Sequence, residues 1–114
     1  MDNIQVSENI RGDLAVFTEA LKNSREYLEY RESAKEVENN PELKQKLSDY
    51  RLMNYNLQQE IDPGVVEQKT EELERIYEEL ERNPVASRFL DAEMTFCRMM
   101  QDITLAIYAS LDIE

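Results

Sequence analysis

Apolar residues recur with helical spacing in the last part of the chain, where the hydrophobic pattern is densest. One row follows alternating steps of four and three: Val85, Phe89, Ala92, Phe96, Met99, Ile103 and Ala106. A second row runs beside it: Leu90, Cys97, Met100, Ile107 and Leu111. Two adjacent rows form an apolar arc wider than the single stripe of a surface helix. The pattern predicts a long helix over 84–112 with neighbours on more than one side.

The rest of the chain also shows helical periodicity. The first periodic segment spans 10–39, and its apolar row begins with Ile10, Leu14, Phe17, Leu21 and Leu28. Beyond Ser24 the row shifts to Tyr27, Tyr30, Ala34 and Val37, which indicates a helix that bends or changes partner midway. The segments 41–61 and 63–82 carry apolar residues at heptad spacing. In 41–61, Asn54 occupies one position of this apolar row.

Three prolines punctuate these segments, and each follows an amide or an acid: Asn40-Pro41, Asp62-Pro63 and Asn83-Pro84. Asn and Asp are good N-caps, and proline suits the first helical position because its missing N–H is not needed there. The sequence therefore predicts four helices, at about 10–39, 41–61, 63–82 and 84–112. A continuous, kinked helix at one of these sites is the alternative. We expect one helical-bundle domain over 10–114, preceded by a flexible segment 1–9.

Heptad spacing in neighbouring helices favours shallow crossing angles, as in antiparallel bundles. A terminal helix of 84–112 would be about 42 Å long, which exceeds the dimensions of a compact globule of this size. We therefore predict an all-α, elongated, antiparallel bundle that leaves apolar surface uncovered and self-associates, as a homodimer or a higher oligomer. The candidate interface residues are Phe89, Phe96, Met99, Met100, Ile103 and Ile107.

The composition restricts the classes of partner. With 25 acidic against 13 basic residues, the formal charge is −12, so a nucleic acid or an anionic membrane surface would be repelled. A basic protein partner is compatible with this charge. The chain contains one cysteine and no long apolar run, and a cytoplasmic protein is the expectation.

Candidate chemistry is sparse. There is no histidine, which removes the usual Glu-x-x-His di-iron pattern of helical bundles, and we expect no enzymatic activity, no metal and no cofactor. Cys97 is interpreted as a small buried hydrophobe, because nothing near it would lower its pKa. Asn54, Glu93 and Asp102 form a candidate polar seam. Each carboxylate would either reach solvent at a rim or pair with an arginine.

The order of several short segments resembles the YlbF/YmcA family of small bacterial helical proteins. The segment Ala20 to Tyr30, followed by Ala34 and Asn40-Pro41-Glu42, resembles the first half of the family. The segment Leu80 to Val85, followed by Phe89 to Glu93, resembles its second half. The resemblance implies a cytoplasmic, oligomer-forming protein without catalytic activity. Some relatives join a complex of related family proteins that works with ribonuclease Y and influences competence, biofilm formation and sporulation.

Iron–sulfur clusters are associated with that complex, but Cys97 alone cannot supply the thiolates of a cluster. The leading hypothesis is therefore a non-enzymatic regulatory or adaptor protein that acts through protein contacts. A bundle that binds a small ligand or a metal through Glu93, Asp102 and nearby tyrosines is one alternative. A purely structural oligomer is the other.

Overall fold

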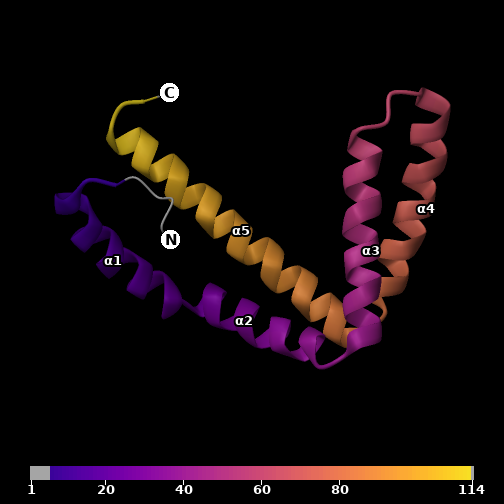
Figure 1. Ribbon diagram of the computed structural model, residues 1–114, viewed down its shortest axis with the longest axis horizontal. Coiled ribbons are helices and arrows are strands. Elements are labelled where there is room, and N and C mark those ends of the chain that lie inside the picture. The colour runs from indigo at the N-terminus through magenta and orange to yellow at the C-terminus, as the bar shows by residue number, and fades with distance from the viewer. Residues whose placement is uncertain (1–5, 114) are drawn as a thin grey trace.

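The computed structural model describes residues 6–113 and consists of helices joined by short turns (Figure 1). The five helices are α1 (Glu8–Lys22), α2 (Arg25–Glu38), α3 (Pro41–Gln58), α4 (Pro63–Glu81) and α5 (Pro84–Ser110). No strand occurs within 6–113, so the predicted all-α class is confirmed. Helix α1 begins two residues before the expected start at 10, and residues 1–5 of the expected flexible segment lie outside the described range.

The first predicted helix, 10–39, is two helices separated at Asn23 and Ser24. The Ser24 hydroxyl donates to the carbonyl of Leu21 at 2.6 Å and accepts from the backbone N–H of Tyr27 at 3.2 Å. Ser24 therefore closes α1 and caps α2, because its extended backbone and short hydroxyl suit an N-cap. The shift of the apolar row after Ser24 was the feature of the sequence that predicted a bend here. In the structure the bend is a complete break between two helices.

The three predicted caps are present. The Asn40 side chain accepts from the N–H of Leu43 at 3.1 Å, and that of Asp62 accepts from the N–H of Gly64 at 3.0 Å. Asn83 accepts from the N–H groups of both Val85, at 2.9 Å, and Ala86, at 3.3 Å. A new helix begins at each proline, so a continuous, kinked helix is wrong at all three sites.

Figure 1 shows two helix pairs, α2 with α5 and α3 with α4, that meet at one end, and α1 continues from α2 away from that end. Helix α5 lies along α2, and we call α1, α2 and α5 the arm; α3 and α4 form a hairpin that projects away from it. The radius of gyration is 18.2 Å, against about 13 Å for a compact domain of this length. The elongated shape is thus confirmed, whereas the described residues do not form the predicted four-helix bundle, because the two pairs diverge.

The core lies where the arm meets the hairpin. Its buried residues come from all four helices that reach this junction: Val37, Leu43, Leu47, Leu80, Ala86 and Phe89. Small residues on the facing helices are also buried, namely Ser33 of α2 and Ala86 and Ala92 of α5, which allows the two backbones to approach closely. The buried core therefore holds the N-terminal end of α5 in place, and the C-terminal end of that helix extends beyond the core.

Candidate protein-interaction surface

An aromatic cluster joins α2 to the first half of α5. The rings of Tyr30 and Phe96 stack with centroids 5.4 Å apart and planes inclined by 3°. Tyr30 also stacks on Phe89 at 5.9 Å, and Tyr27 meets Phe96 at 5.8 Å. Aromatic pairs at these separations add about 0.5–1.5 kcal/mol beyond the burial of their area. This cluster holds the first apolar row of α5 against α2.

Arg88 of α5 reinforces the same contact electrostatically. Its guanidinium lies 2.7 Å from Glu29, 2.8 Å from Glu36 and 3.6 Å from Glu32, all of which are on α2. The hydrogen bond from Arg88 lowers the pKa of the Glu29 carboxyl, and that of Arg88 is raised by the same bond. One cation therefore holds together three glutamates that would otherwise repel one another along α2.

A second ion pair connects the hairpin to the arm. Arg51 of α3 donates to the carboxylate of Glu93 on α5, and its guanidinium lies 5.5 Å from the ring centroid of Phe89, within the range of a cation–π contact. Of the two alternatives for Glu93, a carboxylate that reaches solvent and one that pairs with an arginine, the structure shows the pairing, and the arginine belongs to another helix. Sequence reasoning did not identify Arg51 itself, because the two residues are far apart in the chain.

The second half of α5 is covered much less than the first. Side chains that line one side of the helix are exposed, including those of Cys97, Leu105 and Leu111, and the last two are 65% and 62% accessible. We define the open α5 face by the exposed residues Met94, Cys97, Leu105, Tyr108 and Leu111. Cys97 was predicted to be buried, and the structure corrects this, because no helix covers the second apolar row at that position.

Helix α1 is also poorly covered. Its residues Ile10, Leu14, Val16 and Phe17 are all exposed, and none of the residues of α1 is buried. In Figure 1, α1 runs roughly parallel to the second half of α5 but lies apart from it. The free end of the arm therefore presents large apolar side chains from two helices, a feature typical of protein-interaction sites.

The structure divides the six candidate interface residues into three groups. Phe89 is only 7% accessible and belongs to the core of the chain itself, so it is not available to a partner. Phe96, Met99, Met100 and Ile103 are half-buried, and Ile107 is exposed. Met94, Leu105 and Tyr108 were not singled out from the sequence, although they border the second row at helical spacing.

The three residues of the candidate polar seam are not brought together. Asn54 is exposed on α3, Glu93 is half-buried and paired with Arg51, and Asp102 is exposed on α5. Glu93 and Asp102 are about 13 Å apart along the helix and on opposite sides of it. Within residues 6–113 no cluster of three or more potential ligands could hold a metal ion.

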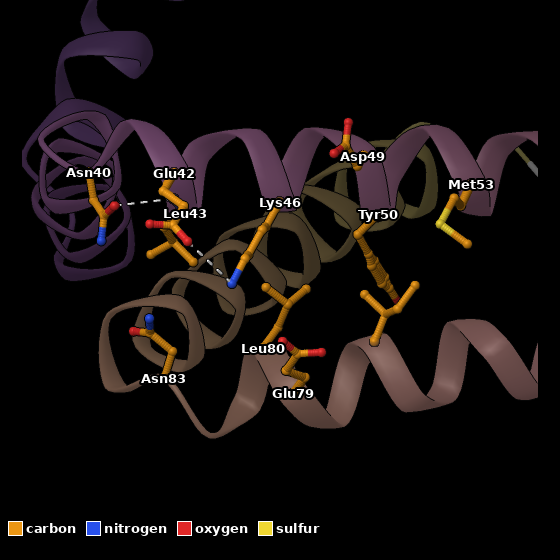
Figure 2. Close-up of a pocket in the computed structure, with 11 residues that line it drawn as sticks. Asn40, Glu42, Leu43, Lys46, Asp49, Tyr50, Met53, Glu79, Leu80 and Asn83 are labelled. Carbon is orange, nitrogen blue, oxygen red and sulfur yellow. Dashed lines mark hydrogen bonds and ion pairs between the residues drawn. The ribbon is translucent and has the colours of Figure 1, made fainter.

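A groove runs between α3 and α4 near the base of the hairpin (Figure 2). It has a volume of about 500 Å³, and Leu43, Tyr50 and Leu80 are among its apolar lining residues. The side chain of Lys46 crosses the groove, and its ammonium lies 3.8 Å from the Glu42 carboxylate. Because charges of both signs line an otherwise apolar groove, no particular chemistry is indicated there.

Among the described residues, no helix is both long and apolar enough to cross a membrane. Helix α5 is the longest of the described helices, with 27 residues. Charged and polar side chains occupy the side of this helix that the apolar arc leaves free.

Comparison with known proteins places this architecture in a family. The chain is 28% identical over 97 residues to a UPF0342 protein of Caldicellulosiruptor bescii, covering 83% of this chain and 82% of that protein. A UPF0342 protein of Caldicellulosiruptor saccharolyticus is 26% identical over 97 residues, with 83% and 81% coverage. No solved structure matches the chain significantly. The family described as "Control of competence regulator ComK, YlbF/YmcA" matches residues 13–112. The chain therefore belongs to the YlbF/YmcA family, as the order of its short segments indicated.

Proposed function

We propose that this protein is a non-enzymatic regulatory or adaptor protein of the YlbF/YmcA type, and that it acts in the cytoplasm through protein contacts made by its arm. The observation that carries the proposal is the exposed apolar surface at the free end of the arm, where Leu105 and Leu111 of α5 lie in solvent. Monomeric proteins rarely leave such a surface uncovered unless a partner binds it.

The pathway in the proposal comes from the family, whose description concerns control of the competence regulator ComK. By resemblance, the proposed setting is a complex of related family proteins that modulates ribonuclease Y and thereby competence, biofilm formation and sporulation. The net charge of −12 supports contacts with proteins in that setting rather than with the RNA backbone.

A chromosomal variant in the native host tests the proposal. Leu105→Glu places a charge on the arm, and Leu52→Glu places the same charge at a position of α3 that is 60% exposed. We expect the arm variant to lose specific partners in affinity purification and to alter the transcript profile as a deletion does. The α3 variant should behave like the wild type.

Two results would count against the proposal. A deletion strain whose transcripts and competence are unchanged would remove the regulatory role. An arm variant that is stably folded and fully functional would remove the arm as the contact surface. The ligand-binding alternative based on Glu93 and Asp102 has lost its structural basis, since the two carboxylates are on opposite sides of α5.

A further inference from the structure

We infer that α1 is a hinged strap, which rotates about Asn23 and Ser24 and closes over the C-terminal part of the first apolar row of α5. The open and closed conformations differ in how much apolar surface the free end of the arm offers. The inference rests on the proposed function, in which the arm makes the protein contacts, and it adds a device within the chain that regulates access to part of that surface.

The first apolar row of α5 continues beyond the helix that covers it. Up to Phe96 the row packs on α2, through the rings of Tyr27 and Tyr30. We define the inner row of α5 as its continuation and the residue that borders it: Met99, Ile103, Ala106 and Ile107. A hollow of about 470 Å³ lies beside the inner row; Glu26 of α2 lines this hollow, and none of the described residues of α1 does. Space for a further helix is therefore left beside the inner row.

Helix α1 carries a matching apolar row, whose members recur at steps of four and three: Ile10, Leu14, Phe17 and Leu21. This side of α1 is the less exposed one, since Leu14 and Phe17 are 38% and 39% accessible, whereas Val16, on the other side, is 71% accessible. Figure 1 shows α1 roughly parallel to the second half of α5 but apart from it. Neither row contains a charged residue, so contact between the two rows would bury no charge.

The packing of α2 on α5 sets the register of the closed strap. These two helices are antiparallel, so each step back along the chain from Tyr27 corresponds to one step beyond Phe96, its contact on α5. Ten residues before Tyr27 is Phe17, and the corresponding position on α5 is next to Ile107. The interface between α2 and α5 can thus continue onto α1 with large apolar side chains on both helices.

The connection between α1 and α2 is suited to a hinge. Only Asn23 and Ser24 separate the two helices, and Ser24 is extended, with a ψ of 148°. Helix α1 has no buried residue and packs mainly on α2, so a rotation of α1 breaks little existing packing. A change of a few backbone angles at a helix end is enough to move a whole helix.

The tether favours α1 over other helices at the inner row. A segment joined to its binding surface by a short connection has an effective concentration of about millimolar, whereas a second copy or another protein competes from solution. A partner that uses the inner row must therefore displace α1 first. The open α5 face is on the other side of the helix and stays exposed in both conformations.

Thiol reactivity measures access to the inner row. In a Cys97→Ser background, Ile107→Cys places a thiol under the closed strap. Tyr108→Cys places one on the open α5 face, where the native side chain is equally accessible, at 49%. If the strap is closed two thirds of the time, Ile107→Cys should react with a maleimide about threefold more slowly, relative to the urea-unfolded chain, than Tyr108→Cys. Adding Phe17→Glu should remove this difference, and adding Val16→Glu should preserve it.

A cross-link identifies the chain that supplies the covering helix. In the closed register Thr18 falls beside Thr104, and helical spacing puts both on the same flank of the two helices. In the Cys97→Ser background, Thr18→Cys with Thr104→Cys should be joined within one chain by a short bismaleimide, at the chain mass of 13.5 kDa plus one reagent. Val16→Cys with Thr104→Cys is the matched control, because Val16 is on the outer side of α1, and it should not be joined.

Three results would overturn the inference. One is an equal rate of reaction for Ile107→Cys and Tyr108→Cys, and another is a slower rate for Ile107→Cys that persists in Phe17→Glu. The third is a cross-linked product of twice the chain mass, which would assign the covering helix to a second copy. Both measurements use the purified protein alone, so a failure here is separate from a failure of the regulatory role in cells.

Discussion

Replacement of Phe89 by alanine should destabilise the protein severely, because this ring connects three helices. Phe89 is 7% accessible in the core where the arm meets the hairpin, stacks on Tyr30 of α2 at 5.9 Å and lies under Arg51 of α3. Truncation of a buried phenylalanine to alanine costs about 3–5 kcal/mol, including the cavity that remains. A domain of this size has a free energy of unfolding of about 5–15 kcal/mol, so the variant should lose at least about a fifth of its stability.

The assay is urea denaturation followed by far-UV circular dichroism, at a protein concentration where the oligomeric state is the same before and after substitution. Phe17→Ala is the matched control, since it removes the same ring from an exposed position on α1 and should cost less than about 1 kcal/mol. If Phe89→Ala and Phe17→Ala lower the free energy of unfolding equally, the assignment of the core to this junction is wrong.

Three further predictions concern a cap, a glycine and an ion cluster. Asn83→Ala removes the acceptor for two backbone N–H groups and should cost about 1 kcal/mol in thermal or urea unfolding, whereas Asn83→Asp should retain most of the stability. Gly12 is inside α1, and a β-carbon there would meet nothing within 4 Å, so Gly12→Ala should stabilise α1 by about 0.5–1 kcal/mol, measured as slower amide exchange in that helix. Arg88 lowers the pKa of Glu29, so the stability from this pair is present above the unfolded-state pKa and is lost as the pH falls through the folded-state pKa. The difference in melting temperature between wild type and Arg88→Gln should therefore shrink between neutral and acidic pH, and a difference that is constant with pH would refute the role of Arg88.

Local features of this fold could be predicted from the sequence because their causes are local. Each Asn-Pro or Asp-Pro pair carries both the capping side chain and the residue that favours the first helical position, so the boundaries at 41, 63 and 84 followed directly. The break at Ser24 was visible only as a shift of the apolar row. No proline marks it, and a serine inside a helical pattern is compatible with a continuous helix.

The arrangement of the helices in space was harder to predict from the sequence. Heptad phase in 41–61 and 63–82 indicated which faces are apolar, but it did not indicate that α3 and α4 would pair with each other and leave α5 covered on one side. That outcome depends on long-range contacts such as the pairs of Arg88 with the glutamates of α2 and of Arg51 with Glu93. For the same reason the sequence suggested a buried Cys97, since a second apolar row does not reveal whether a helix of the same chain covers it.

The junction of hairpin and arm has a mechanical consequence. Helices α3 and α4 are anchored to the rest of the molecule in their lower half, by the core near the turns at Asn40 and Asn83 and by the pair of Arg51 with Glu93. The far half of the hairpin is therefore free to move when the hairpin rotates about the core. Helix α3 is about 27 Å long, and a rotation of about 10° at its base would displace the tip, where Ile61 is fully solvated, by about 5 Å. Small adjustments in the packing around Phe89 would thus be amplified at the far end of the hairpin, where a distance-sensitive spectroscopic label would register them.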